Sequence, residues 1–258
     1  MSETTPSASQ IFSLQGRTAI VTGASAGLGM RFATLLADAG ADVYAAARRL
    51  DRLEALAATH DRIHPVQCDV ADEGDRVRLV DLAISGTGHL DVLVNNAGTG
   101  GHGRAVDESW ETFRQTLDVN LVAPFHLSCL MAGAPSPRRT RSIVNISSIL
   151  GMVSGAPLSG ASYAASKAGL IGLTRELAGQ WGRDGIRVNS LAPGWFRSEM
   201  TEDLFADQRS SDWVTKNTQL RRAGEANELD GALLFLASDA SSYTTGHVLV
   251  VDGGWTAR

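Results

Sequence analysis

Seven short apolar runs, separated by longer segments, constrain the fold of this 258-residue chain more than any other feature. The runs cover residues 17–22, 42–47, 64–68, 91–95, 142–147, 187–192 and 248–251. Helical patterns lie between them, at residues 28–39, 72–85, 109–131, 162–181 and 226–236. Strands that are apolar on both faces and are joined through helices form parallel sheets that helices cover on both sides. The sequence therefore predicts a doubly wound α/β fold, with a seven-stranded parallel sheet as the middle of three layers.

The same pattern predicts how the chain is organised. No repeat or internal linker interrupts it, so we expect a single domain at residues 14–258 after a flexible leader at 1–13. The stretch around 195–218 is polar and reads as irregular. Because it departs from the end of a strand, we expect it to form a lid over the substrate.

Composition excludes several classes of function. The chain is 43% hydrophobic and 20% charged, with a formal net charge of -5, so nothing draws it to nucleic acid or to an anionic membrane. Its two cysteines, Cys68 and Cys129, lack the paired spacing of a zinc site. Residues 1–15 are rich in Ser and Thr and show no basic cluster followed by a long apolar run, so we expect no signal peptide there. No stretch reaches the run of about 18 apolar residues that crosses a bilayer. We expect a cytoplasmic protein with reduced cysteines and no metal ion.

A glycine-rich loop, Thr-Gly-Ala-Ser-Ala-Gly-Leu-Gly at residues 22–29, joins the first strand to the first long helix. Residues without a Cβ atom let the backbone approach a ligand, and the positive end of the helix suits a pyrophosphate. The spacing differs from the commonest dinucleotide fingerprint, and a tight turn with no ligand is the alternative. The expected dinucleotide contacts are Gly23, Ser25, Ala26, Gly27, Leu28 and Gly29.

The end of the second strand indicates which dinucleotide binds. An acidic residue there would bind the ribose hydroxyls of NAD, but this chain has Ala47 followed by Arg48 and Arg49. A guanidinium group attracts the 2′-phosphate of NADP through charge-assisted hydrogen bonds. We therefore expect NADP(H) to be preferred, with Arg48 as the main contact and NAD(H) still possible. Alternatively, both arginines are solvated.

Tyr163 and Lys167 form a candidate acid–base pair. Residues four apart on a helix share one face, so the phenol and the ammonium group can lie close together. A nearby cation lowers the pKa of a phenol from its ordinary value near 10, and we expect this effect on Tyr163. Taken alone, the pair is also compatible with an ordinary helix surface.

Together these motifs resemble the short-chain dehydrogenase/reductase family over residues 14–255. Several further motifs stand in the family's order. They are Asp69, the Asn-Asn-Ala-Gly sequence at 95–98, Asn120, Ser148, Pro193-Gly194 and the Asp-Gly-Gly sequence at 252–254. The resemblance implies a Rossmann-type fold and an NAD(P)-dependent oxidoreductase that interconverts a ketone and a secondary alcohol. It also implies a homotetramer or homodimer, and the general look is nearest to 3-oxoacyl-thioester reductases.

The resemblance assigns four catalytic residues. Ser148 and Tyr163 would hydrogen-bond the substrate oxygen, and Tyr163 would transfer the proton. Lys167 would hold the nicotinamide ribose, and Asn120 would anchor a chain of water molecules. The family pattern selects Ser148 over Ser147 because Gly151 follows three residues later. A serine hydrolase is excluded because Ser148 has no His and Asp partners at recognisable spacing.

The resemblance also implies the remaining cofactor contacts. Asp69 would bind the adenine, although a helix N-cap is the alternative role for it. Ser198 stands where the family usually has Thr and would meet the nicotinamide carboxamide, unless it only caps the next helix. The other expected contacts are Val70, Asn96, Ala97, Gly98, Pro193, Gly194 and Phe196.

The substrate is less constrained. Leu150, Leu158 and Trp195, with Ser148 and Tyr163, are expected to line a partly hydrophobic pocket for a ketone or alcohol. Polyol dehydrogenases, reductases of cyclic ketones and a non-catalytic dinucleotide sensor are alternatives on the same scaffold.

Two surface features bear on partners. A basic patch would receive an acidic carrier protein or would simply be solvated, and it consists of Arg138, Arg139 and Arg141. Apolar positions on two helices would suit either subunit contacts or the core. They are Leu117, Leu121, Phe125, Leu170, Leu173 and Leu177.

Overall fold

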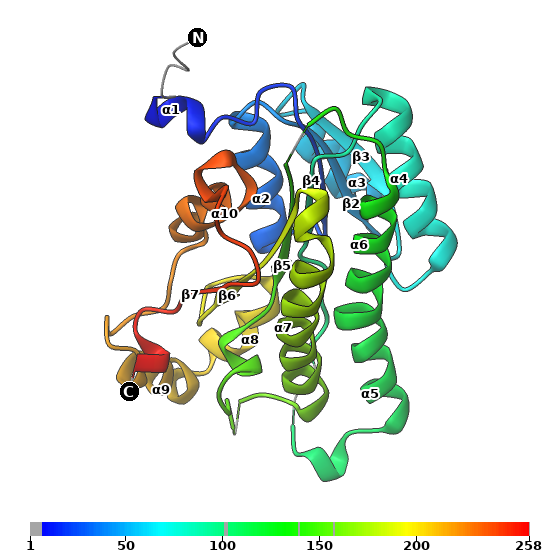
Figure 1. The fold of residues 1–258 in the computed structure, drawn as a ribbon. Helices are drawn as coiled ribbons and strands as arrows, with labels where there is room; N and C mark the ends of the chain where they lie inside the picture. The colour runs from blue at the N-terminus through cyan, green and yellow to red at the C-terminus, as the bar shows by residue number, and fades with distance from the viewer. Residues whose placement is uncertain (1–6, 101–102, 139, 157, 258) are drawn as a thin grey trace.

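The computed structural model describes residues 7–100, 103–138, 140–156 and 158–257. Seven strands form one parallel sheet in the order β3-β2-β1-β4-β5-β6-β7 (Figure 1). The strands are β1 (Thr18–Thr22), β2 (Asp42–Ala47), β3 (Ile63–Gln67), β4 (Val92–Asn95), β5 (Arg141–Ile146), β6 (Ile186–Pro193) and β7 (Val248–Val251). Each strand end lies within one residue of the predicted position. The doubly wound α/β fold is therefore confirmed, and the strand order reverses between β1 and β4.

Helices cover both faces of the sheet (Figure 1). They are α1 (Ala8–Ile11), α2 (Gly27–Asp38), α3 (Leu50–Ala57), α4 (Glu73–Thr87), α5 (Trp110–Leu117), α6 (Ala123–Gly133), α7 (Ala161–Trp181), α8 (Glu202–Ala206), α9 (Gln208–Asn217) and α10 (Asp230–Ala237). Helices α2, α3 and α10 pack on one face of the sheet, and α4, α6 and α7 pack on the other. Within the described ranges, no helix has the length and hydrophobicity needed to cross a membrane.

The core consists of two apolar clusters, one on each face of the sheet. Strand β1 contributes to both, with Val21 facing Phe32 and Leu233 and with Ile20 facing Leu127 on the opposite side. Every residue of β1 is buried, which explains why its sequence is a continuous apolar run. The strands are therefore held rigidly, and the loops at their carboxyl ends are fixed in place.

The expected lid is more regular than its sequence suggested. Residues 195–218 were expected to be irregular, but α8 and α9 form within them. The Asp207 side chain accepts a hydrogen bond from the Ser210 backbone amide at 2.9 Å and so caps α9. Val214 is the one residue of α9 that is fully buried. Most residues of α9 are polar, so no apolar run marks this helix in the sequence.

The predicted helix at 109–131 is interrupted by a π-helical segment, Asp118–Val122. The Ala123 amide donates to the Asp118 carbonyl, five residues back. Pro124, which has no amide hydrogen to donate, starts the next turn. Asn120, which the resemblance assigned to the active site, lies in this π turn, and such turns are frequent at functional sites.

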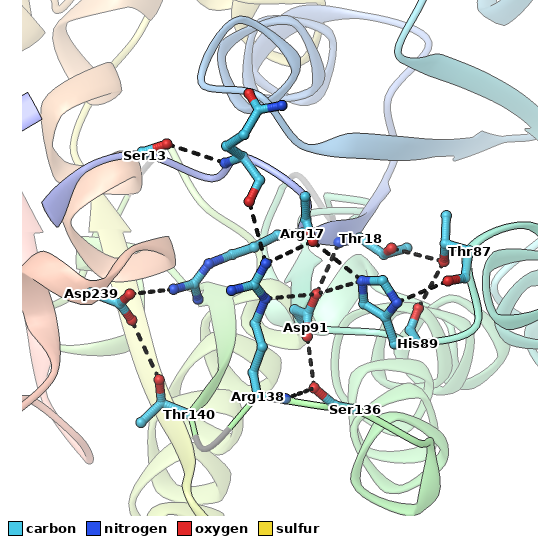
Figure 2. Close-up of polar contacts among 12 residues, drawn as sticks. Ser13, Arg17, Thr18, Thr87, His89, Asp91, Ser136, Arg138, Thr140 and Asp239 are labelled. Carbon is cyan, nitrogen blue, oxygen red and sulfur yellow. Dashed lines mark hydrogen bonds and ion pairs between the residues drawn. The ribbon is translucent and has the colours of Figure 1, made fainter. Parts of the chain in front are cut away.

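A polar network joins the amino-terminal ends of the central strands around Asp91, whose side chain is completely buried (Figure 2). Asp91 accepts hydrogen bonds from the Thr18 amide at 3.0 Å and from the Ser136 hydroxyl at 2.7 Å. The His89 Nε2 atom lies 3.2 Å from its carboxylate, and the Arg138 Nε atom lies 3.6 Å away. The network joins β1, the start of β4 and the loop before β5. It lies at the amino-terminal ends of these strands, and the glycine-rich loop lies at the opposite, carboxyl-terminal end of β1.

Two arginines of the basic patch expected near residue 140 make contacts within the chain. Arg138 donates to the carbonyl of Gly16 at 2.7 Å in addition to its contact with Asp91. Arg141 donates to the carbonyls of Met131 and Ala134, each at 2.9 Å. Arg139 lies outside the described residues. The acidic carrier partner stays a prediction.

Candidate active site

A cavity of about 610 Å³ opens at the carboxyl ends of the strands. Its wall combines the glycine-rich loop, the ends of β2 and β4, part of α7 and the start of the lid. All of the predicted cofactor contacts lie on this wall. They are Gly23, Ser25, Ala26, Gly27, Leu28, Gly29, Arg48, Arg49, Asp69, Val70, Asn96, Ala97, Gly98, Tyr163, Lys167, Pro193, Gly194, Phe196 and Ser198.

The glycine-rich loop is packed so tightly that Gly23 and Gly29 have no room for a side chain. A Cβ atom on Gly23 would lie 2.9 Å from the Ala97 Cα atom, and one on Gly29 would overlap the Gly23 carbonyl. Helix α2 begins at Gly27, and no side chain of the described residues caps it at Ala26. Its first amide groups are thus left for a ligand, as a dinucleotide pyrophosphate would require. The loop fits the cofactor that the sequence predicted.

Thr22 holds together the loops that follow β1 and β4, the two strands between which the strand order reverses. Its hydroxyl oxygen accepts hydrogen bonds from the backbone amides of Asn96 and Ala97, each at 3.0 Å. The Asn96 side chain returns a hydrogen bond to the Thr22 carbonyl at 2.8 Å. The segment after β4 is therefore fixed against the glycine-rich loop, on the wall of the cavity.

The two arginines after β2 have different surroundings. The Arg49 Nε atom donates to the Ser25 hydroxyl at 3.2 Å, and its Nη1 and Nη2 atoms donate to Glu199 at 2.8 and 2.9 Å. The Arg48 side chain is exposed and makes no hydrogen bond within the described part of the chain. The ion pair raises the pKa of Arg49 and lowers the pKa of Glu199 to about 2, in each case chiefly through the hydrogen bonds between them.

Asp69 and Ser198 each had an alternative role as a helix cap. The carboxylate of Asp72, and not that of Asp69, caps α4 by accepting from the Asp75 amide at 2.8 Å. Asp69 accepts from the Ala71 amide at 3.0 Å and faces the cavity. Ser198 also lies on the wall, and its backbone amide donates to the Thr201 hydroxyl at 3.0 Å in the turn that begins the lid. Ser198 therefore combines a helix-start position with a place at the site.

The predicted catalytic side chains of Ser148, Tyr163 and Lys167 meet on the same wall. Ser148 follows β5, whereas Tyr163 and Lys167 project from α7. The Lys167 Nζ atom lies 5.5 Å from the centre of the Tyr163 ring and donates to the Ile146 carbonyl at 2.8 Å. The end of β5 therefore positions both Ser148 and the Lys167 ammonium group.

Gly151 explains how the turn after Ser148 comes so close to α7. A Cβ atom on Gly151 would lie 2.6 Å from the carbonyl carbon of Lys167 and 2.8 Å from the Ala168 nitrogen. Only a residue without a side chain lets the turn Ile149–Gly151 rest directly on the helix backbone. The Ser148 hydroxyl accepts from the Leu150 amide at 3.1 Å, which fixes its direction.

Asn120 is buried in the π turn and joins three parts of the site. Its Oδ1 atom accepts from the Thr99 amide at 2.8 Å, and its Nδ2 atom donates to the Thr99 carbonyl at 2.8 Å and to the Ser166 hydroxyl at 3.0 Å. A Cβ atom on Gly98 would lie 3.4 Å from Asn120 Oδ1 and 3.6 Å from Lys167 Nζ, so these two polar groups flank Gly98. The proposed water chain at Asn120 stays a prediction.

The electrostatics differ from the sequence expectation at Tyr163. Burial raises the pKa of Tyr163, and a hydrogen bond with the Ser148 side chain opposes that rise. Burial also lowers the pKa of Lys167 to about 8. The expected lowering of the Tyr163 pKa by the ammonium group is therefore wrong for the chain alone. Removal from water outweighs the hydrogen bond with Ser148.

Three of the expected substrate contacts are not on the cavity wall. Ser148 and Tyr163 line it, but Leu150, Leu158 and Trp195 pack in an adjoining apolar cluster, against which Tyr163 also packs. Leu150 and Trp195 are each 8% exposed. Burial of apolar surface against apolar neighbours stabilises this packing.

The Trp195 side chain instead supports the lid. Its ring lies 6.3 Å from that of Trp213 on α9 and 5.6 Å from that of Trp255 near the carboxyl end of the chain, in edge-to-face geometry. Trp213 and Trp255 are themselves 4.9 Å apart. Edge-to-face aromatic contacts add stability beyond the area they bury. The cluster thereby anchors α9 to the end of β6.

Glu108 is a functional residue that the sequence did not reveal. Helix α7 has Gly160 at its N-cap position, which offers no side chain for capping. The Glu108 carboxylate accepts hydrogen bonds instead from the Ser162 amide, at 3.2 Å, and from the Ser162 hydroxyl. The helix that carries Tyr163 is thus capped from a segment 54 positions away, and no local motif marks such a contact.

The chain is similar in sequence to known oxidoreductases. A family model described as Enoyl-(Acyl carrier protein) reductase matches residues 23–256. The chain is 36% identical over 250 residues to gluconate 5-dehydrogenase of Gluconobacter oxydans (strain 621H), covering 95% of this chain and 97% of that protein. It is 35% identical over 245 residues to the 3-oxoacyl-[acyl-carrier-protein] reductase FabG of Thermotoga maritima, covering 93% and 98%.

Solved structures show the same fold at similar identity. A short-chain type dehydrogenase/reductase from Mycobacterium marinum matches with a TM-score of 0.91 and 33% identity, over 96% of this chain and 99% of that one. A gluconate 5-dehydrogenase from Burkholderia cenocepacia, in complex with NADP and tartrate, matches with a TM-score of 0.90 and 33% identity, over 98% and 100%.

Proposed function

The chain belongs to the short-chain dehydrogenase/reductase family, and we propose that it is an NADP(H)-dependent oxidoreductase that interconverts a ketone and a secondary alcohol with Tyr163 as the acid and base. The observation that carries this proposal is the meeting of Ser148, Tyr163 and Lys167 on the wall of one cavity. The glycine-rich loop forms another part of that wall. Relatives named as dehydrogenases and reductases support the reaction class.

Proton transfer falls to Tyr163. Its hydroxyl gives a proton to the substrate oxygen when a ketone is reduced and takes one when an alcohol is oxidised. The Ser148 hydroxyl accepts from the Leu150 amide, which leaves its own hydrogen to donate to the substrate oxygen or to Tyr163. A donor fixed in this way stabilises the charge that develops on the oxygen.

The residues on the wall of the cavity suit a dinucleotide. The glycine-rich loop would hold the pyrophosphate, Lys167 would hold the nicotinamide ribose and Asp69 would bind the adenine. Ser198 would meet the carboxamide. When bound, the dinucleotide supplies or accepts the hydride that changes the oxidation state of the substrate carbon.

NADP(H) is favoured by the two arginines after β2. Arg48 and Arg49 both line the cavity, and no acidic residue stands at the end of β2 to bind the ribose of NAD. The NADP bound to the Burkholderia cenocepacia relative supports the same preference. NAD(H) remains the alternative cofactor.

A small sugar acid or polyol is the substrate class that we propose. Leu150, Leu158 and Trp195, which were expected to line the pocket, pack in the apolar cluster beside it, whereas the polar residues Thr99 and Gln115 lie on its wall. The gluconate 5-dehydrogenase relatives support a polyhydroxy substrate. A 3-oxoacyl thioester is the second candidate, supported by the relative from Thermotoga maritima.

A homotetramer or homodimer would use the outer face of α5, the π segment and α6. Trp110, Val122 and Phe125 are 67%, 46% and 46% exposed there. Leu170 and Leu177, which were expected either here or in the core, are buried within the chain. The cytoplasmic location stays a prediction from the sequence.

Turnover of a substrate panel tests the proposed function. The purified chain is mixed with sugar acids, polyols, 3-oxoacyl thioesters and cyclic ketones, in each case with NADPH or NADP⁺, and the absorbance of the reduced nicotinamide is followed. We expect turnover with at least one sugar acid or polyol. Dinucleotide binding without turnover across the panel would favour the sensor alternative, and no dinucleotide binding would contradict the proposal.

A further inference from the structure

An ion pair spans the rim of the cavity between the end of β2 and the start of the lid. Arg49, at the N-cap position of α3, binds both carboxylate oxygens of Glu199, the first residue of the short helix Glu199–Thr201. Arg52 adds longer contacts to the same oxygens, at 3.3 and 3.4 Å. The side chains of Arg49 and Glu199 are 41% and 48% exposed, and both residues line the cavity.

The carboxylate of Glu199 occupies the donors that a phosphate would need. Arginine binds carboxylates and phosphates in the same two-pronged geometry. The Glu199 carboxylate accepts hydrogen bonds from Nη1 and Nη2 of Arg49, and the Ser25 hydroxyl accepts one from Nε. Because the ion pair holds the pKa of Glu199 near 2, the carboxylate is ionised at every physiological pH. It would therefore oppose a second anion on the same guanidinium.

The backbone at the start of the lid fixes where Glu199 stands. The Thr201 hydroxyl donates to the Phe196 carbonyl at 2.6 Å and accepts from the Ser198 amide at 3.0 Å. Phe196 is itself buried against the core. The hydrogen bonds of Thr201 therefore close a turn at residues 196–201, and this turn holds Glu199 near the end of β2.

We propose that Glu199 is a specificity-determining residue whose carboxylate competes with the 2′-phosphate of NADP(H) for Arg49. The inference rests on the proposed function, in which this cavity binds a dinucleotide. NAD(H) has no 2′-phosphate, so it leaves the Arg49–Glu199 pair intact. Glu199 therefore weakens NADP(H) binding selectively, and it frees the start of the lid when the phosphate replaces it.

Binding of the two adenosine halves of the cofactors tests this inference. Isothermal titration calorimetry is used with 2′,5′-ADP, which carries the 2′-phosphate, and with 5′-AMP, which lacks it. Glu199→Gln is expected to bind 2′,5′-ADP about three- to fivefold more tightly than the wild type, the range typical of a half-exposed ion pair, and 5′-AMP within about twofold. Glu202→Gln is the matched control because Glu202 is exposed on the same lid and pairs with no arginine of the described ranges.

A second variant shows whether the effect passes through Arg49. In an Arg49→Gln background, Glu199→Gln is expected to change 2′,5′-ADP binding by less than about twofold, because the shared partner is gone. Unchanged or weaker 2′,5′-ADP binding in Glu199→Gln alone would overturn the inference. So would weaker 5′-AMP binding, which would show that Glu199 holds the adenosine ribose.

Full-length NADP⁺ separates this inference from the proposed function. If the wild type binds NADP⁺ but Glu199→Gln does not alter 2′,5′-ADP binding, the inference alone fails. If the wild type binds neither NADP⁺ nor NAD⁺, the proposed function fails, and the inference fails with it.

Discussion

The Lys167 ammonium nitrogen lies 5.5 Å from the centre of the Tyr163 ring, one helical turn along α7. Its hydrogen bond to the Ile146 carbonyl holds it at the end of β5. Burial acts on both groups by favouring their neutral forms, because it raises the pKa of Tyr163 and lowers that of Lys167 to about 8. The site therefore holds two titratable groups whose ionisation the surrounding chain resists.

Tyr163→Phe is expected to reduce kcat by about 10² or more, because the substrate oxygen loses its proton donor. Dinucleotide affinity should stay within about twofold of the wild type, since the ring is retained. Steady-state kinetics and calorimetry measure the two quantities. Tyr243→Phe is the control because Tyr243 is fully exposed. A rate near that of the wild type in Tyr163→Phe would refute the proposed mechanism.

Lys167→Met is expected to stabilise the folded chain at neutral pH. The folded-state pKa of Lys167 is about 8, below the ordinary 10.5, so the unfolded chain binds this proton more tightly. The destabilising cost is complete below pH 8 and disappears as the pH rises to about 10.5. The variant should therefore unfold with a free energy about 1–3 kcal/mol higher than the wild type at pH 7.

Urea denaturation at pH 7 and near pH 10.5 measures this effect. The difference between Lys167→Met and the wild type should shrink at the higher pH. Lys216→Met, an exposed site on α9, controls for the loss of one lysine. A variant that is less stable than the wild type at pH 7 would show that the hydrogen bond to Ile146 outweighs the burial of the charge.

Glu108→Ala should lower the free energy of unfolding by about 1 kcal/mol, the usual effect of losing a helix cap. The amide and hydroxyl of Ser162 lose their acceptor, at the first turn of the helix that carries Tyr163. Thermal and urea unfolding measure the loss. Asp107→Ala, a neighbouring exposed position, is expected to change stability by less than about 0.5 kcal/mol. Equal losses in the two variants would argue against a capping role for Glu108.

Asp91→Asn is expected to lower the free energy of unfolding by about 2–4 kcal/mol, because it removes the buried charge at the centre of a hydrogen-bonded network. Its side chain is completely buried among Thr18, His89, Ser136 and Arg138 (Figure 2). The network lies at the amino edge of the sheet, so kcat at 25 °C should stay within about twofold. A large loss of kcat in a folded variant would contradict this separation of stability from catalysis.

The features that the sequence predicted share one property, which is that each is encoded locally. The strands follow from continuous apolar runs, such as the one that forms β1. Ser148 was separated from Ser147 by the position of Gly151, and the structure supplies the physical reason in the contact of Gly151 with the backbone of Lys167.

The features that the sequence did not predict depend on contacts between distant positions. Arg49 and Glu199 are 150 positions apart, and Ser162 and Glu108 are 54 apart, so no spacing rule connects them. Trp195 was assigned to the pocket from its place after β6, but its neighbours Trp213 and Trp255 draw it into the lid cluster. The pKa of Tyr163 depends on burial, which a single sequence does not specify.

The number of residues in the π turn at Asp118–Val122 determines where Asn120 points. Deleting any one of its five residues would restore a regular helix and turn everything on one side by about 100° relative to the other. Asn120 would then swing away from Thr99 and Ser166. A substitution along this helix leaves the direction of the helix unchanged. The loss of one residue from the π turn would realign the part of the site that the helix carries.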